Sequence, residues 1–135
     1  MTKIYLASIY ERRAELQEYM RRIEAAGFKV TSRWLMHDFD DSNWAAQAII
    51  DLEDIQDCDG FIVFTEEKGY KGRGGKDFET GYALALGKPI AVVGPVQHQF
   101  YCIFDEERLP LAGGAYYRTE SIEEMLKAFE ENPGE

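Results

Sequence analysis

A loop rich in glycine and basic residues is the first segment of this sequence that could do chemistry. It runs from Gly69 to Lys76 and has the sequence GYKGRGGK. Glycines let backbone N–H groups approach an anion closely at the start of a helix. The loop does not fit the ATP-binding pattern, because Tyr70 stands where the first glycine belongs and Asp77 follows in place of serine or threonine. It also lacks the third glycine of the dinucleotide-binding pattern. The loop therefore predicts either a small-anion site or a plain surface turn.

A glutamate follows this loop at a position suited to nucleophilic chemistry. Glu79 lies in the run DFETGYA, which we expect to form the first turn of a helix that begins at the carboxyl end of a strand. The helix dipole favours a carboxylate there, so Glu79 is expected to stay ionised, as a nucleophile should. First-turn glutamates without any catalytic role are also common, and the spacing leaves both interpretations open.

Acidic residues gather just before an unbroken apolar run, GFIVF. Asp51 stands beside isoleucine and leucine on a predicted helix, at a spacing that would let it face the edge of a pocket. Asp54, Asp57 and Asp59 follow it, and all four could equally form a solvated acidic face. The residues alone do not choose among them.

The hydrophobic pattern places these residues on alternating strands and helices. Strands are predicted at 3–7, 28–34, 60–64, 89–93 and 115–118, and helices at 10–26, 43–57, 76–86 and from 121 onward. Asp41 or Ser42 is expected to cap the second helix, and Ser121 with Glu124 forms a capping box for the last.

This alternation predicts one α/β domain over residues 1–131. It would be doubly wound, of the flavodoxin or Rossmann type, with a parallel sheet of about five strands and a short frayed tail, 132–135. Ligands of such sheets bind at the carboxyl ends of the strands. The site is therefore expected in the loops after Ala7, Trp34, Phe64 and Val93.

Charge and cysteine content limit the classes of partner. The 135 residues carry 15 basic and 25 acidic side chains, a net charge of −10. Such an acidic surface repels phosphate backbones, so no nucleic acid polymer is expected as a partner. Cys58 and Cys102 form no CxxC pair, so neither a disulfide framework nor a zinc site is expected. Without an apolar stretch suited to a signal peptide or membrane span, a cytoplasmic protein with no membrane partner is predicted.

Taken together, the sequence resembles the nucleoside 2-deoxyribosyltransferase family and the related 2'-deoxynucleoside 5'-monophosphate N-glycosidases. The matching segments are KIYLAS at 3–8, Asp51 with DCDG at 57–60, the block from Gly72 to Pro89, and VGP at 93–95. The resemblance covers about residues 3–100. Its most specific part is the block GRGGKDFETGYALALGKP.

The resemblance implies a role for individual residues. Glu79 matches the family's nucleophile, which attacks C1' of the sugar while the base departs, after which a second base or water releases the sugar. Asp51 would bind or protonate the leaving base, and Tyr5 would orient the Glu79 carboxylate. The substrate-binding positions would be Ser8, Arg73, Gly75, Lys76, His98 and Trp34, with the turn at 10–12 beside the sugar. No metal or cofactor is implied, because an anionic nucleophile and a protonated leaving base suffice.

Several positions depart from the family pattern. Arg73 stands where transferases acting on free nucleosides often carry an aspartate, and a cation there, with Lys76 nearby, would suit a 5'-phosphate. His98 matches a position that reaches a neighbouring subunit's site, which implies a homo-oligomer, although a solvated loop histidine is the plain alternative. Trp34 and Trp44 flank a loop, 35–43, that could close over the ligand or stack on a base; simple packing is equally open.

Three functions from different classes are therefore open. The first is a transferase of nucleotide salvage that exchanges bases on a 2'-deoxyribose. The second is a hydrolase that splits a nucleoside 5'-monophosphate into base and sugar phosphate, which Arg73 and Lys76 favour. The third is a non-catalytic nucleotide-binding module, against which the retention of Tyr5, Asp51 and Glu79 together argues. The sequence predicts the transferase slightly ahead of the hydrolase, with nucleoside or nucleotide and nucleobase as partners.

Overall fold

A five-stranded parallel sheet organises the chain. The computed structural model describes residues 1–37, 41–104 and 115–134. The strands are β1 (Lys3–Ala7), β2 (Lys29–Val30), β3 (Gly60–Phe64), β4 (Ile90–Val93) and β5 (Tyr116–Thr119). Their order is β2-β1-β3-β4-β5 and every pair is parallel. The predicted α/β sheet is confirmed.

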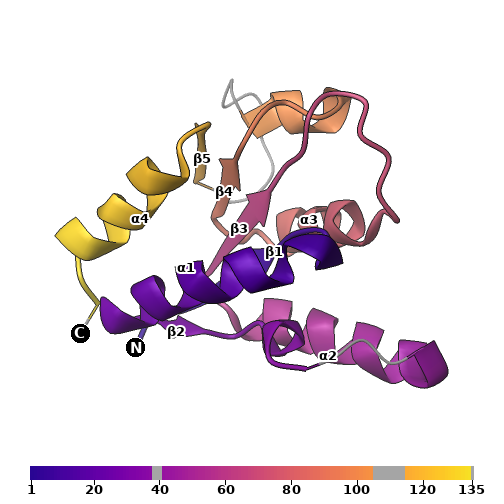
Figure 1. Cartoon of the computed structure of the whole chain (residues 1–135), viewed down its shortest axis with the longest axis horizontal. Coiled ribbons are helices and arrows are strands. Elements are labelled where there is room, and N and C mark those ends of the chain that lie inside the picture. The colour runs from indigo at the N-terminus through magenta and orange to yellow at the C-terminus, as the bar shows by residue number, and fades with distance from the viewer. Residues whose placement is uncertain (38–40, 105–114, 135) are drawn as a thin grey trace.

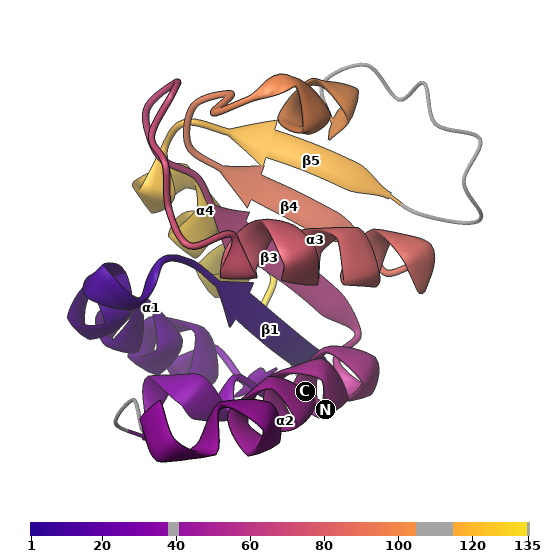
Figure 2. The same cartoon turned by 90° about the vertical axis from the view of Figure 1, so that its right-hand side faces the viewer.

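Helices cover both faces of the sheet (Figures 1 and 2). The four α-helices are α1 (Arg13–Ala25), α2 (Trp44–Asp57), α3 (Gly75–Ala85) and α4 (Ile122–Glu131). Short 3-10 segments lie at η1 (Tyr10–Arg12), η2 (Arg33–Leu35), η3 (Asp41–Asn43) and η4 (Gln99–Phe104). Helices α1 and α4 pack on one face, and α2 and α3 on the other, as a doubly wound domain requires. Among the described residues, no helix combines the length and apolar character needed to cross a membrane.

Alternation along the strands divides the core into two halves. On β1, Ile4 and Leu6 join the core beneath α1 and α4, whereas Tyr5 and Ala7 join the core beneath α2 and α3. Successive side chains of a strand point to opposite faces, so this division follows directly from the sequence. Tyr5 is thereby directed toward the two helices that carry Asp51 and Glu79.

The second strand is shorter than predicted. β2 ends at Val30, and the chain then turns into η2 instead of remaining extended to residue 34. Side chains take over the pairing with β1 at this point. The Ser32 hydroxyl accepts from the N–H of Leu6 at 2.7 Å, and the Trp34 indole donates to the carbonyl of Leu6 at 2.9 Å. Because these groups satisfy the backbone of Leu6, a longer strand is not required.

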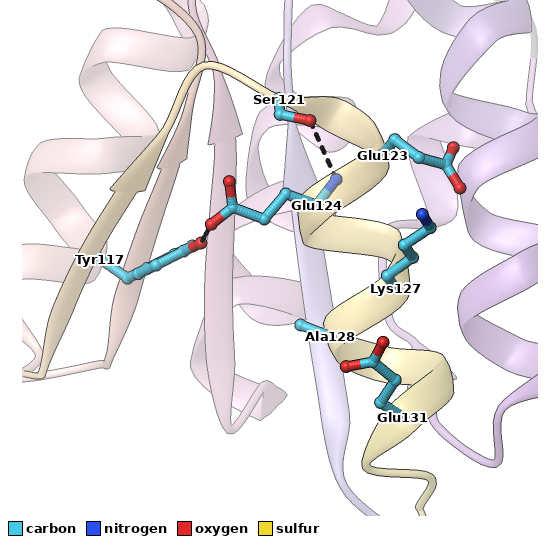
Figure 3. A pocket seen from close by; sticks show the side chains of 7 residues that line it. All are labelled: Tyr117, Ser121, Glu123, Glu124, Lys127, Ala128 and Glu131. Atoms are coloured by element: carbon cyan, nitrogen blue, oxygen red, sulfur yellow. Dashed lines mark hydrogen bonds between the residues drawn. The ribbon is translucent and has the colours of Figure 1, made fainter.

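Two helix starts differ in detail from the sequence prediction. Asn43, and not Asp41 or Ser42, occupies the N-cap position of α2, and its side chain makes no capping hydrogen bond. Ser121 caps α4 as predicted, accepting from the N–H of Glu124 at 3.0 Å. The other half of the capping box does not form, because the Glu124 carboxylate accepts from the Tyr117 hydroxyl (Figure 3) and from the Thr119 hydroxyl. These contacts border a surface hollow over β5 and α4.

The last described residues are tied to the end of α1. The N–H of Gly134 donates to the carbonyl of Ala26 at 2.7 Å, and a Cβ added at Gly27 would collide with the Gly134 carbonyl. Gly27 has φ of +98°, which allows this close approach. The tail thus contacts the end of α1 through Gly134, and its fraying stays a prediction.

Candidate active site

The phenol of Tyr5 meets the carboxyl group of Glu79 beneath α3. Tyr5 is fully buried in the middle of β1 and stacks on its ladder neighbour Phe61, with ring centroids 5.5 Å apart and an interplanar angle of 7°. Its hydroxyl donates to Glu79 Oε2 at 3.1 Å. A ring held by the sheet has little freedom, so Tyr5 fixes the position of this carboxyl group.

Asp51 completes the group from α2. Its carboxyl group is hydrogen-bonded to that of Glu79, and both side chains are half-buried. A hydrogen bond between two carboxyl groups requires a proton on one of them. Tyr5, Asp51 and Glu79, which come from β1, α2 and α3, therefore form one hydrogen-bonded unit.

Burial and neighbouring carboxylates raise the pKa of both carboxyl groups, which favours a proton on this pair. Burial, followed by the nearby Asp51 carboxylate, raises the pKa of Glu79 to about 8. Burial, followed by the charge of Asp54, raises the pKa of Asp51 to about 6. The prediction that Glu79 stays ionised through the helix dipole is wrong for this structure. Glu79 is the fifth residue of α3, past the first turn, where Asp77 stands instead, and burial beside a second carboxyl group dominates.

The other aspartates of this region have structural partners. Asp54 is buried and accepts from the backbone and side chain of Arg33 at 3.0 and 2.9 Å. Asp57 pairs with the Lys3 ammonium, and Asp59 accepts from the Lys3 backbone N–H. Only Asp51 of the four approaches Glu79 within the described structure, which separates it from a uniformly solvated acidic face.

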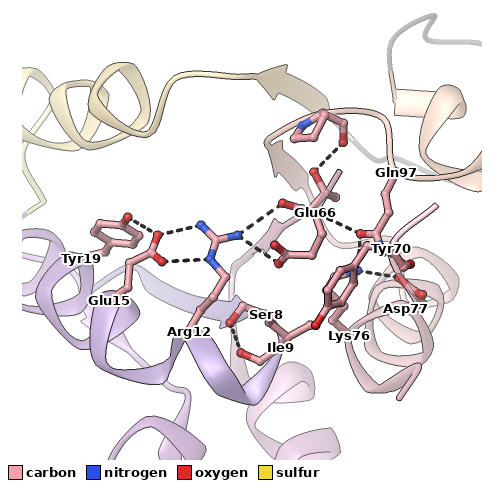
Figure 4. Close-up of polar contacts among 12 residues, drawn as sticks. Ser8, Ile9, Arg12, Glu15, Tyr19, Glu66, Tyr70, Lys76, Asp77 and Gln97 are labelled. Atoms are coloured by element: carbon pink, nitrogen blue, oxygen red, sulfur yellow. Dashed lines mark hydrogen bonds and ion pairs between the residues drawn. The ribbon is translucent and has the colours of Figure 1, made fainter. Parts of the chain in front are cut away.

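The region expected to hold the sugar's 5' end lies at the carboxyl end of β1. Ser8 follows β1, and its hydroxyl donates to the Ile9 carbonyl at 2.7 Å (Figure 4). Gly74 occupies the N-cap of α3 in the left-handed conformation, with φ of +90°, and no side chain caps this helix. Gly75 begins α3 and is exposed, as is Arg73 just before it. The start of α3 is thus exposed at Gly75 and buried at the next residue, Lys76.

The turn at 10–12 anchors the start of the loop between β3 and α3. The Arg12 guanidinium pairs with Glu15 on α1 at 2.7 Å and with Glu66 at 3.2 Å, and it donates to the Thr65 carbonyl at 3.3 Å (Figure 4). Arg12 is therefore engaged within the chain itself.

Lys76 and His98 gather around Asp77. Lys76 is only 6% exposed, and its ammonium lies 2.7 Å from Gln97 Oε1 and 3.2 Å from Asp77 Oδ1. His98 Nε2 lies 3.3 Å from Asp77 Oδ2, and Tyr101 donates to Asp77 Oδ1 at 2.6 Å. The Lys76 charge is thus directed at the protein's own acceptors, whereas Arg73 stands on the exposed loop. That His98 reaches the active site of a neighbouring subunit stays a prediction.

Trp34 packs within the fold at the edge of the site. Its indole N–H is bonded to Leu6, and the ring lies against both halves of the core. Trp44, at the start of α2, is 64% exposed. Stacking of either ring on a base stays a prediction, and part of the loop that they flank, 38–40, lies outside the described residues.

Sequence reasoning did not find Gln97, Asp77 or Tyr101. Gln97 is 3% exposed and contacts Glu66, Tyr70 and Lys76, which are 21 to 31 residues away. A single glutamine in a loop carries no spacing signal, because its partners are brought together only by the fold. Nowhere in the described ranges do three or more His, Cys, Asp or Glu side chains converge in a way that could hold a metal ion.

Comparison with known proteins finds the same fold in solved structures. No protein-family model matches the chain, and no curated protein matches it in sequence. Solved structures, in contrast, match the chain in fold. The chain is similar to the CMP N-glycosidase BcmB of Clostridium botulinum, with a TM-score of 0.63 and 18% identity over 95% of this chain and 98% of that one.

It is also similar to a 2-deoxyribosyltransferase of Bacillus psychrosaccharolyticus, with a TM-score of 0.65 and 20% identity over 96% of this chain and 90% of that one. A conserved protein of Enterococcus faecalis V583 has a TM-score of 0.58 and 16% identity over 99% of this chain. The fold of the chain is thus of the nucleoside 2-deoxyribosyltransferase type, as its sequence resemblance implied.

Proposed function

We propose that this protein cleaves the N-glycosidic bond of a 2'-deoxynucleoside or its 5'-monophosphate and transfers the sugar to another nucleobase. The observation that carries this proposal is the hydrogen-bonded unit of Tyr5, Asp51 and Glu79. A nucleophile, an acid and an orienting donor are the groups that a two-step glycosyl transfer requires.

The shared proton fits both roles in the first step. Glu79 has the higher pKa of the pair, so the proton first passes from Glu79 across their hydrogen bond to Asp51. The Glu79 carboxylate then attacks C1' and the electron pair of the glycosidic bond moves to the base. Asp51 delivers its proton to the departing base, and the sugar is left as an ester of Glu79. Tyr5 donates to Glu79 Oε2, which stabilises the carboxylate form before attack.

The second step reverses the first with a new acceptor. A nitrogen of a second nucleobase attacks C1', the ester bond breaks, and the acceptor's proton passes to Asp51. Glu79 is then free as a carboxylate. The configuration at C1' is retained, because each step inverts it once.

The similar solved structures support glycosidic chemistry in general. One is named as an N-glycosidase acting on a nucleoside monophosphate and the other as a deoxyribosyltransferase, and both cover almost the whole chain. The two activities share bond cleavage and differ in whether water or a base completes the reaction.

Hydrolysis of a nucleoside 5'-monophosphate is the second candidate, and one observation favours it. Four of the chain's 15 basic residues, Lys68, Lys71, Arg73 and Lys76, stand within the nine residues 68–76, where no acidic residue occurs. Lys68, Lys71 and Arg73 are exposed on the loop that leads into the uncapped start of α3, whereas Lys76 is buried against Gln97 and Asp77. A concentration of cations in a protein of net charge −10 suits a small anionic group at the 5' end of the sugar.

Chromatography of reaction mixtures tests these candidates. The protein is incubated with 2'-deoxynucleosides and their 5'-monophosphates, each with and without a second free base. A new nucleoside that forms only with acceptor base supports transfer, and free base with sugar phosphate in its absence supports hydrolysis. Glu79→Ala should abolish either activity, and a folded Glu79→Ala protein that retains it would disprove the mechanism. No turnover of any substrate by the parent protein would leave the binding module as the better interpretation.

A further inference from the structure

A single buried amide contacts the loop between β3 and α3 at two points and the first turn of α3 at a third. We propose that Gln97 is a positioning residue that holds this loop, residues 66–74, at the carboxyl end of β1 and so sets the affinity for the substrate's 5' end. The affinity part of this proposal rests on the proposed function, whereas the anchoring of the loop does not.

The contacts of Gln97 reach the start and the middle of the loop and Lys76 in the first turn of α3 (Figure 4). Its Oε1 accepts from the N–H of Glu66 at 3.0 Å and from the Lys76 ammonium at 2.7 Å. Its Nε2 donates to the Tyr70 carbonyl at 3.0 Å, and the Gln97 backbone carbonyl accepts from the N–H of Gly69 at 3.3 Å.

The orientation of this amide is fixed by its partners. The Lys76 ammonium and the Glu66 N–H can only donate, and the Tyr70 carbonyl can only accept. Rotating the amide by half a turn would place its NH2 group against the ammonium. Because Lys76 is buried and also paired with Asp77, its charge keeps Gln97 in one orientation. A hydrogen bond to a charged group contributes more to stability than one between neutral groups.

The composition of the loop leaves its backbone with wide conformational freedom. Residues 67–75 are all exposed, and four of the nine are glycines. Arg12 holds the side chain of Glu66 at the start, and the N–H of Tyr70 donates to the Glu67 carbonyl within the loop. A glycine-rich exposed segment has a large conformational entropy, so its position depends on such anchors.

The anchored loop borders the predicted substrate. A Cβ added at Gly72 would lie 3.6 Å from the Ile9 side chain, which follows Ser8 at the end of β1. Lys71 and Arg73 flank Gly72, and Gly74 and Gly75 begin α3 directly afterwards. Gln97 therefore determines where these basic side chains stand relative to β1.

Two variants of Gln97 and one control test the proposal. Gln97→Leu removes all three side-chain contacts. Gln97→Glu keeps an acceptor for Glu66 and Lys76 but places an oxygen against the Tyr70 carbonyl. Gln99→Ala changes an exposed glutamine two residues further along and serves as the matched control. The measurements are hydrogen exchange of the backbone amides, thermal unfolding, and kcat and KM for 2'-deoxynucleoside 5'-monophosphates.

We expect Gln97→Leu to speed exchange of the Glu66 amide and of the 66–74 segment by about tenfold or more, with α2 and the strands unchanged. KM should rise about tenfold with kcat within about threefold, because the loop binds substrate and does not carry the reacting groups. Gln97→Glu should protect the Glu66 amide but loosen the middle of the loop, and its KM should be intermediate. Gln99→Ala should match the parent protein.

Unchanged exchange in the 66–74 segment of Gln97→Leu would overturn the proposal. So would faster exchange spread over the whole domain, or a fall in kcat at constant KM, since these indicate general destabilisation. If Gln97→Leu does not fold, Gln97→Glu decides by exchange at the middle of the loop. If the parent protein turns over no substrate, the proposed function fails, and the exchange measurement still decides whether Gln97 anchors the loop.

Discussion

The contact between Asp51 and Glu79 is the most consequential at the scale of single residues. Two carboxyl groups that share a proton titrate as a pair, first from two protons to one and then from one to none. Only the singly protonated pair holds both a carboxylate for attack and a proton for the leaving base. The pH range in which this singly protonated pair predominates lies between the two raised pKa values, about 6 and about 8.

We therefore predict a bell-shaped pH profile of kcat/KM. Activity should rise as pH increases through about 6, where the pair loses its first proton, and fall through about 8, where it loses the second. Initial rates between pH 5 and 9.5 at constant ionic strength provide the measurement. In Asp51→Asn the fall at high pH should disappear and the rate should drop about 100-fold or more, since the proton donor is absent. A flat profile in the parent protein would contradict this assignment.

Removing the charge of Glu79 should stabilise the fold. Its pKa is raised in the folded state, so the folded protein binds this proton more tightly than the unfolded chain does. Stability is therefore lost as pH rises from about 4.5 toward about 8. Glu79→Gln should raise Tm by an amount equivalent to about 1 kcal/mol or more at pH 8.5, and by less at pH 5.

Thermal unfolding at both pH values measures this difference, with the exposed Glu67→Gln as the control for a general change of charge. An equal gain at pH 5 and pH 8.5 would show that the protonation of Glu79 is not responsible.

Much of this site could be predicted from the sequence, but not its electrostatics. Resemblance named Tyr5, Asp51 and Glu79, and the structure brings all three together. The protonation of Glu79 could not be predicted, because it depends on a carboxyl group 28 residues earlier in the chain that only the packing of α2 against α3 brings near. Gln97 was missed for the same reason, since all of its side-chain partners are distant in sequence.

At the scale of elements, the loop between β3 and α3 decides how the 5' end of a substrate is recognised. Its exposed cations lie next to a helix start that no side chain caps. Lys76 was expected to contribute here as well, but its ammonium serves Gln97 and Asp77 instead. Of the predicted pair, Arg73 is thus the exposed residue and Lys76 the buried one.

Arg73→Ala should weaken recognition of a monophosphate more than that of a nucleoside. We expect KM for the 5'-monophosphate to rise about tenfold and KM for the matching nucleoside by less than about twofold. Steady-state kinetics with both substrates provide the comparison. Lys127→Ala removes the same charge from an exposed position on α4 and should leave both KM values unchanged. Equal effects of Arg73→Ala on the two substrates would refute a phosphate role.

The periodicity of the sequence located the main elements well and their ends less well. β3 matches its prediction residue for residue, because an unbroken apolar run bounded by polar residues leaves little choice. β2 does not, because hydrogen bonds from Ser32 and Trp34 replace backbone pairing at Leu6. Local propensity contains no information on such long-range side-chain contacts.

At the scale of the whole molecule, the C-terminal residues are joined to the end of α1 at Gly27. We predict that Gly27→Ala destabilises the fold by about 1–3 kcal/mol, because its φ of +98° disfavours a side chain and the new Cβ would displace Gly134. Chemical denaturation measures the loss.

Gly69→Ala is the matched control, since its φ of +83° imposes similar strain while its surroundings are open. If both variants lose the same stability, contact with the tail contributes nothing. Assembly into a homo-oligomer stays a prediction that the molar mass in solution will test.

The junction between β1 and residues 31–35 has a consequence for the behaviour of the protein at high concentration. An outer strand with unpaired amides invites the strand of another molecule to extend the sheet, which is a common route to aggregation. Here β2 spans only two residues, and the amide and carbonyl of Leu6 just beyond it are already bonded to Ser32 and Trp34. Side chains thus close this margin of the sheet, and no template for intermolecular strand pairing is left at Leu6.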